Sequence, residues 1–291
     1  MTSYKIKPVE ELEFSDDFMF FRVMQNESIC RQVLERLLGI KIQRVKKKEL
    51  QKTLKPYYEA KGIRLDVYAA DESRVFDVEM QKFPKADLPR RVRYYQSMLD
   101  ADSLVAGENY SALKESYVLF ICLNDPFGKN LPVYTFRKCC LEDKGLVLPD
   151  GAVAIFFNAA AFSKTENLAL GAFLRYTKTQ EAQDELTERI ATLVQEFKRN
   201  ELFRSSYMRE SLALFDARKL GYDEGVAHGR AEGITQGRSE GIAEGFTRGA
   251  QKRAQEAAHN LLTMHVLSVE QIAQATGLSP SAVRTLQEQL Q

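Results

Sequence analysis

The segment GIRLDVYAADESRVFDVEMQ, residues 62–81, decides the fold class of the chain. Its two runs, 62–70 and 74–81, are rich in β-branched and aromatic residues. Between them stands the triplet Asp-Glu-Ser at 71–73, whose members favour turns. The segment therefore predicts a β-hairpin.

Acidic side chains of this hairpin are expected to meet on one of its faces. Because side chains alternate across a strand, Asp77, Glu79 and Gln81 share a face. Asp66 on the neighbouring strand can converge with Glu79. The other face is apolar and predicts contact with a core, through Leu65, Val67, Phe76, Val78 and Met80. A carboxylate cluster beside a hydrophobic sheet suits a hard divalent cation such as Mg²⁺. The alternative is that the acidic face of the hairpin is exposed to solvent and its acids pair with Arg and Lys.

A basic helix is predicted after the hairpin, in a segment that includes RVRYYQSMLD, residues 91–100. Its Arg91 and Tyr95 could clamp a phosphate at the acid cluster, because a guanidinium and a hydroxyl both donate hydrogen bonds to phosphate oxygens. The alternative is a solvated basic face whose tyrosines pack on the sheet.

The other patterns in the first 175 or so residues alternate between helix and strand. Ser15 precedes a helical pattern and is expected to cap a helix, and a second helix is expected to end at Gly39. The apolar run 117–123 predicts a buried strand, and further strands are expected at 131–136 and 152–157. Mixed helices and strands in this order predict an α/β domain with a central sheet.

Composition narrows the class of protein further. The chain has 291 residues, a net charge of +1 and 44% hydrophobic residues, which excludes a histone-like basic protein, an acidic tail protein and a wholly disordered chain. No apolar run is long enough for a membrane span, and the N-terminus lacks a signal-peptide core, so a cytoplasmic location is expected. The four cysteines and three histidines have no zinc-site or disulfide spacing and predict buried, reduced thiols.

A set of motifs in fixed order resembles the recombination-promoting nuclease family, also described as PD-(D/E)xK-type transposases. The resemblance implies a PD-(D/E)xK restriction-endonuclease-like core, with helices around a mixed sheet, followed by an all-α C-terminal extension. It also implies Mg²⁺-dependent cleavage of DNA phosphodiesters, with Mn²⁺ as a substitute, and a link to bacterial recombination or horizontal DNA transfer. The motifs are SDDFMF (15–20), GIRLDVYAAD (62–71), FDVEMQ (76–81), RVRYYQSMLD (91–100), GENY (107–110), YVLFICLNDPFG (117–128), YTF (134–136) and DGAVAIFFN (150–158).

The resemblance assigns roles to individual residues. Asp66 and Glu79 correspond to the two metal-binding strand acids, and Gln81 corresponds to the third motif position, where many enzymes of the wider fold have lysine. A neutral Gln81 can orient the attacking water only by hydrogen bonds. Asp16 or Asp17 matches the family's N-terminal acid and is expected either to complete the metal shell or to cap a helix.

Three further assignments come from the residues themselves. Asp77 shares the face of Glu79 and is a candidate ligand for a second ion. Arg91 and Tyr95 are expected to hold the scissile phosphate during in-line displacement. The run 46–48, three lysines, is expected either to contact the DNA backbone or to be a solvated charge run.

A glycine repeat dominates the C-terminal third. Eight of the 16 glycines fall at intervals of four from Gly221 to Gly249. In a helix each costs about 1 kcal/mol relative to alanine, so an isolated helix is disfavoured. Strict register favours close pairing with a second helix, and hence a homo-oligomer, because a linker needs composition but not register. A period of four would wind such a pair into a right-handed supercoil. The alternative is a linker.

The final segment, 267–290, resembles a short helix–turn–helix, with Ser268 as a cap, Gly277 at the turn and Ser279–Pro280 opening the last helix. It needs a third helix, expected at 252–265. Its second helix offers few cations for DNA, so a packing or self-association module is an equal alternative to a DNA reader.

These patterns predict four segments and two candidate functions. The segments are a nuclease domain (1–178), a helical connector (179–220), the repeat as helix or linker (221–250) and a helical tail (251–291). The first function is a metal-dependent DNA endonuclease with a C-terminal oligomerisation region, without organic cofactor or membrane attachment. The second is a catalytically inactive, transposase-like oligomer associated with DNA.

Overall fold

The computed structural model describes residues 6–42, 45, 47–54 and 63–290. The chain divides into two compact units, residues 1–212 and 213–291. No helix within the described ranges is long and apolar enough to cross a membrane.

The first unit is built on a mixed sheet of six strands within the described residues, in the order β1-β2-β3-β4-β6-β5. Strands β1, β2 and β3 are antiparallel neighbours, β3, β4 and β6 run parallel, and β5 is antiparallel to β6. The strands are β1 (Lys47–Leu54), β2 (Ile63–Ala70), β3 (Arg74–Gln81), β4 (Glu115–Cys122), β5 (Val133–Phe136) and β6 (Ala152–Asn158).

The predicted hairpin is β2–β3. Asp71 fixes its turn, because its Oδ1 accepts hydrogen bonds from the N–H groups of Ser73 (3.0 Å) and Arg74 (2.8 Å). The Asp71 carboxylate also pairs with the Arg74 guanidinium at 2.6 Å. The strand residues on both sides of the turn are therefore held in register from the first pair, Ala70 with Val75.

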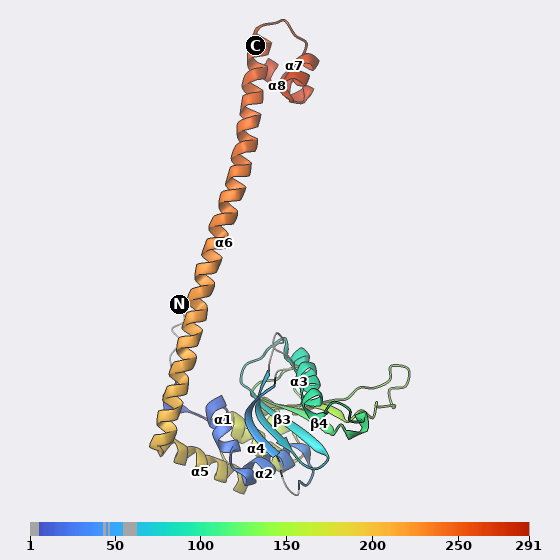
Figure 1. The fold of residues 1–291 in the computed structure, drawn as a ribbon, viewed down its shortest axis with the longest axis vertical. Coiled ribbons are helices and arrows are strands. Elements are labelled where there is room, and N and C mark those ends of the chain that lie inside the picture. The colour runs from blue at the N-terminus through green and yellow to red at the C-terminus, as the bar shows by residue number, and fades with distance from the viewer. Residues whose placement is uncertain (1–5, 43–44, 46, 55–62, 291) are drawn as a thin grey trace. The chain divides into compact units, whose positions relative to one another are not determined.

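Helices cover both faces of the sheet (Figure 1). On one face, α3 (Leu88–Ser103) packs its Val92, Tyr95 and Leu99 against the strands. The opposite face packs against helices α1, α2, α4 and α5 through the main core, which includes Phe76, Val78 and Met80 as predicted. Leu65 lies instead in the core beneath α3. These four helices are α1 (Asp17–Met24), α2 (Glu27–Leu38), α4 (Leu168–Thr179) and α5 (Glu185–Arg199), and short 3₁₀ turns occur at Val9–Glu11, Tyr110–Ala112 and Ala159–Lys164.

The structure corrects the expectations for Ser15 and for two of the four cysteines. Ser15 does not cap α1; Asp16 occupies the cap position, and the Ser15 hydroxyl donates to the Glu13 carboxylate. Helix α2 ends at Gly39 as predicted, with φ of 67°. Of the four free cysteines, Cys30 and Cys122 are buried as expected, whereas Cys139 is exposed and Cys140 is partly exposed.

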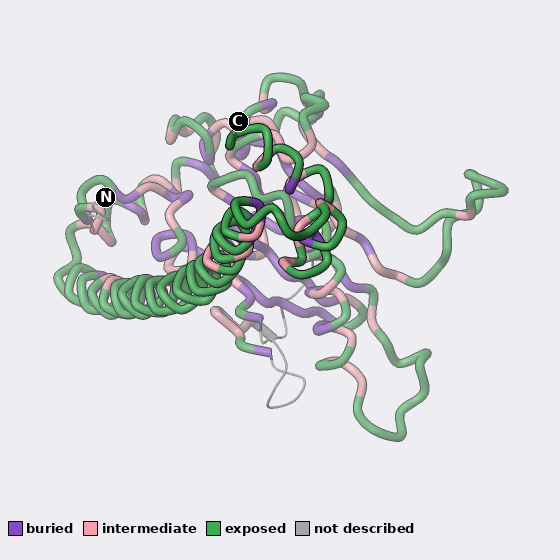
Figure 2. The backbone as a smooth tube through the Cα atoms, turned by 90° about the horizontal axis from the view of Figure 1, so that it is seen from above, coloured by how far each residue is buried: buried purple, intermediate pink, exposed green. Residues whose placement is uncertain are grey.

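Helix α6 (Glu201–Thr263) begins in the first unit, where Phe203 and Tyr207 enter the main core. It continues through the second unit and contains the whole glycine repeat, so the repeat is helical. Figure 2 shows this stretch of α6 as exposed. A Cβ added at any of the eight glycines would meet nothing within 4 Å, so no other part of the described chain packs against them.

The tail forms a small three-helix cluster within the second unit. Helices α7 (Val269–Thr276) and α8 (Pro280–Glu288) pack with the end of α6 around Ala258, Leu262, Ile272, Ala273 and Val283. Ser268 caps α7 in a reciprocal capping box with Gln271, and Gly277 ends α7 in the left-handed region. The third helix expected at 252–265 is thus the end of α6.

Candidate active site

The site lies where the β2–β3 ladder stops. Backbone pairing continues from the turn as far as Val67 with Val78, so Asp66 and Glu79 form the next opposed positions. At this end of the hairpin, side-chain carboxylates take the place of backbone carbonyls as hydrogen-bond acceptors. The Asp66 N–H donates to Glu79 Oε1 (2.9 Å), and the Met80 N–H donates to Asp66 Oδ2 (3.1 Å). The structure therefore brings together the two acids that the strand alternation predicts.

Each of these acids keeps one oxygen turned away from the backbone. Asp66 Oδ1 accepts no hydrogen bond from the described residues, and Glu79 Oε2 lies 3.6 Å from Nη2 of Arg91. Asp66 is partly exposed, whereas Glu79 is 4% exposed. The remaining oxygens are thus available to a ligand that approaches from the solvent side of Asp66.

Asp77 is the most unusual acid of the group. Its side chain is fully buried, neither carboxylate oxygen accepts a hydrogen bond from an N–H group or hydroxyl of the described residues, and the Glu79 carboxyl lies beside it as a polar neighbour. Burial, and then the charge of Asp66, raises the pKa of Asp77 well above its ordinary value. A buried carboxylate without a donor is strongly disfavoured, so this position requires either a proton or a cation.

The other two acids are perturbed in the same direction. Burial raises the pKa of Asp66 to about 6, and the charge of Asp17 adds to the increase. Burial, followed by the charges of Asp77 and Asp66, raises the pKa of Glu79 well above its usual range. Buried carboxyl groups that repel one another are typical of sites that hold a cation or handle protons.

Gln81, Arg91 and Tyr95 form one hydrogen-bonded row beside the acids. Arg91 Nη1 donates to Gln81 Oε1 (2.9 Å), and Nη2 donates to the Tyr95 hydroxyl (3.0 Å). The Gln81 amide nitrogen donates to the carbonyl of Phe83. Gln81 therefore retains one acceptor lone pair and one N–H for a further partner, and Tyr95 retains its hydroxyl proton.

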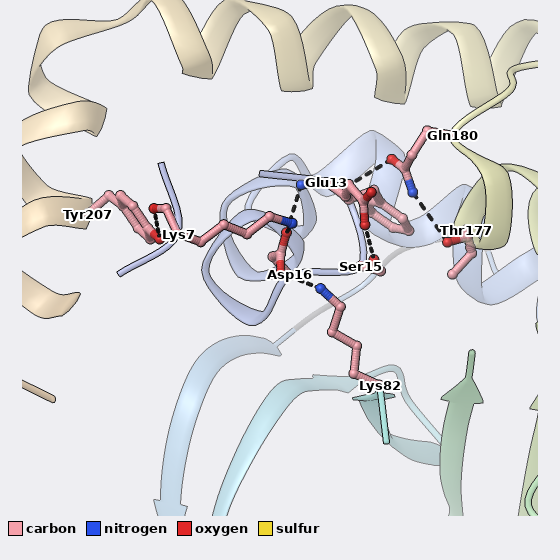
Figure 3. Close-up of polar contacts among 9 residues, drawn as sticks. Lys7, Glu13, Ser15, Asp16, Lys82, Thr177, Gln180 and Tyr207 are labelled. Atoms are coloured by element: carbon pink, nitrogen blue, oxygen red, sulfur yellow. Dashed lines mark hydrogen bonds and ion pairs between the residues drawn. The ribbon is translucent and has the colours of Figure 1, made fainter. Parts of the chain in front are cut away.

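Figure 3 shows Asp16 with the groups that hold its carboxylate. Asp16 accepts bonds from the Lys7 ammonium (2.7 Å), the Glu13 N–H (2.8 Å) and the Lys82 ammonium. Burial opposes its ionisation, but these donors together hold the pKa of Asp16 below its ordinary value. Its side chain makes no helix-capping bond. Asp16 is thus an anchor between α1 and the end of β3.

Asp17, the first residue of α1, is exposed to solvent. Loss of solvation beside neighbouring protein atoms, and then the charge of Asp16, nevertheless raises the pKa of Asp17, and the charge of Asp17 in turn raises the pKa of Asp66. Of the two candidates for the N-terminal acid, Asp17 is therefore the one within electrostatic reach of Asp66.

The carboxylates of the site are the kind of ligand that binds a hard cation, but they are not grouped as tightly as the ligands of a bound metal ion. In the described part of the chain, no three His, Cys, Asp or Glu side chains are grouped closely enough to hold a metal ion. The buried oxygens of Asp77 and the Oδ1 atom of Asp66 are nevertheless the ligand type that Mg²⁺ and Mn²⁺ prefer. A divalent cation would also offset the repulsion between charges that, after burial, raises the pKa values of Asp66, Asp77 and Glu79.

The Asp16–Lys82 pair was not anticipated from the sequence, because it joins residues 66 positions apart. The only local signal is that Lys82 follows Gln81 and so points to the other face of the strand. Of the lysine run at 46–48, Lys46 lies outside the described residues, as do the side chains of Lys47 and Lys48.

A mixed sheet flanked by helices, with opposed acids on a central hairpin, defines the PD-(D/E)XK class of α/β folds. Residues 15–219 match the model of the PD-(D/E)XK nuclease family transposases, and the chain belongs to this family. Comparison with curated proteins and with solved structures finds no match. The matched range includes every candidate site residue and ends two residues before Gly221, so the glycine repeat lies beyond it.

Proposed function

We propose that the chain is a metal-dependent DNA endonuclease with Mg²⁺ as its ordinary cofactor and Mn²⁺ as a substitute. The observation that supports the proposal best is the pairing of Asp66 with Glu79 at the open end of the β2–β3 ladder. The raised pKa values of these acids and of Asp77 indicate that the site is built to receive positive charge. Membership of a nuclease family makes DNA the expected substrate.

Each site residue then has a chemical task. Asp66 and Glu79 would hold the cation, with Asp17 and Asp77 available to complete its surroundings. When bound, the cation would supply Lewis-acid activation of water and of the phosphate. Gln81 orients the attacking water through its remaining lone pair or N–H.

Helix α3 would hold the scissile phosphate through Arg91 and Tyr95. Arg91 lies 3.6 Å from Glu79 and is hydrogen-bonded to Tyr95, so its guanidinium is held rigidly at the edge of the acid group. A preorganised guanidinium stabilises charge that develops on a phosphate during in-line displacement. Tyr95 is 8% exposed and can add one O–H donor.

The proposal is tested by incubating supercoiled plasmid with the full-length protein. We expect nicking in Mg²⁺ or Mn²⁺ and none in EDTA. The competing proposal is a transposase-like protein that associates with DNA without cutting it. DNA binding without nicking in any divalent ion would favour that competitor and contradict the nuclease. A role in recombination or gene transfer would follow from the cleavage activity.

We also propose that the repeat between Gly221 and Gly249 pairs with the same helix of a second copy. Val226, Ile234 and Ile242 recur every eight residues on α6 and are 52%, 62% and 64% exposed. The neighbouring glycines have no side chain, and no described residue covers them, so two helix backbones can approach closely there. We further propose that the four segments of the chain, from the nuclease domain to the helical tail, meet after residues 178, 220 and 250.

Replacing four repeat glycines, Gly229, Gly233, Gly237 and Gly241, with alanine should separate pairing from mere helix formation. Each change stabilises the isolated helix by about 1 kcal/mol, because alanine has the higher propensity. The added methyl groups nevertheless keep a second helix away, so we expect sedimentation velocity to show at least about tenfold weaker self-association. Ser239→Ala is the control on the same helix. A quadruple variant that associates as tightly as wild type would contradict the pairing.

A further inference from the structure

An aromatic side chain stands exposed beside the candidate site. Phe83 is 71% exposed, two residues beyond Gln81. The backbone around it is fixed: the Gln81 amide donates to the Phe83 carbonyl, the Asn124 amide donates to the Lys82 carbonyl at 3.2 Å, and the Lys82 ammonium is tied to Asp16. The exposed ring is therefore carried on an anchored segment.

The surroundings of the ring combine apolar and cationic groups. Phe83 lines a small recess together with Gln81, Lys85 and Asn124, and Gln81 in turn accepts a hydrogen bond from Arg91. Lys85 is exposed, and its charge offsets part of the rise in the pKa of Asp17, which places its ammonium within electrostatic reach of that acid. A strand of nucleic acid crossing the site would meet a cation and an aromatic face together.

An exposed aromatic ring beside a cation would distinguish DNA with unpaired bases from duplex DNA. A flat aromatic ring gains by stacking on a base whose face is free. In a duplex the base faces are covered by their neighbours, and the protein meets mainly phosphates and groove edges. A ring at the site therefore favours a strand with an unpaired base, whether single-stranded or locally opened.

We propose that Phe83 stacks on an unpaired nucleobase next to the scissile phosphate, so that single-stranded or locally unpaired DNA is the preferred substrate. The inference rests on the proposed nuclease function and adds the substrate class to it. Lys85 contacts a neighbouring phosphate in this arrangement.

The chain contains no tryptophan, so Phe83→Trp creates a single fluorescent reporter at the position in question. Full-length protein in EDTA would be titrated with an oligo-dT strand and with a blunt duplex of equal length. We expect saturable quenching of the Phe83→Trp variant by the single strand and little change with the duplex. Tyr110→Trp is the matched control, because Tyr110 is 82% exposed on a surface turn, and its fluorescence should not respond.

Affinity provides the second readout. We expect Phe83→Ala to weaken single-strand binding by roughly 5- to 150-fold while duplex binding stays unchanged, and Phe83→Tyr to retain the wild-type affinity. Single-strand binding that neither quenches the Phe83→Trp variant nor depends on the ring would overturn the stacking, even if plasmid nicking succeeds. A protein that binds neither DNA and nicks no plasmid would overturn the proposed function, and this inference with it.

Discussion

Asp66→Asn is expected to reduce metal-dependent plasmid nicking by roughly a thousandfold, on the order of the loss caused by removing one preorganised electrostatic group from other hydrolases. Asparagine has nearly the same shape and keeps an oxygen that can accept the Met80 N–H, so the end of the hairpin stays closed. What disappears is the negative charge and the free anionic oxygen. The measurement is the initial rate of conversion of supercoiled to open-circular plasmid in Mg²⁺.

Two controls make that result specific. Asp143→Asn introduces the same chemical change on an exposed loop, where its side-chain oxygen still accepts the Gly145 N–H, and should leave nicking unchanged. Glu79→Gln should be as damaging as Asp66→Asn, and the double variant should be little worse than either, because residues that act as a unit are not additive. Nicking that survives both single changes would place the chemistry elsewhere.

Asp77→Asn is expected to stabilise the metal-free protein at pH 8. The folded-state pKa values of Asp66, Asp77 and Glu79 are raised, so protonation favours folding. Their contribution to stability is fully present below pH about 4 and is lost as the pH rises through about 6 and above. At pH 8 in EDTA the uncharged amide of the Asp77→Asn variant removes one of the repelling charges and can donate to a neighbouring carboxylate.

Thermal unfolding measures this effect. We expect the first transition of Asp77→Asn to lie about 3–8 °C above that of wild type in EDTA at pH 8, corresponding to roughly 1–2 kcal/mol. At pH 5 the gain should shrink, because the wild-type group is already protonated. In excess Mg²⁺ it should shrink or reverse, because bound cation stabilises the wild-type protein. An Asp77→Asn protein that melts lower than wild type in EDTA at pH 8 would contradict the account.

The parts of the structure that local sequence specifies were predictable. The β2–β3 hairpin follows from alternation and from one turn residue, Asp71, and the opposed acids follow from the hairpin. The ends of α7 follow from Ser268 and Gly277 for the same reason. In each case the deciding contacts join residues only a few positions apart.

Contacts between distant segments were not predictable in this way. Helix α4 was not anticipated, although Asn167 caps it, because its apolar face is defined by packing against α2 and α5. Neither the sheet order nor the Asp16–Lys82 anchor can be derived from spacing, since both depend on which elements meet in space. The choice between Asp16 and Asp17 also depended on a partner, Lys82, that the local motif does not contain.

The hydrogen bonds that Asp66 and Glu79 make to the backbone have an evolutionary consequence. These side chains close the end of the hairpin as well as forming the proposed metal site, so selection for folding alone would preserve them. A descendant that had lost DNA cleavage would still carry both acids. With the proposed roles, intact motif acids would overstate how many family members remain active. Changes at Arg91 or Asp17, which close no strand pair, would be the earlier sign of lost catalysis.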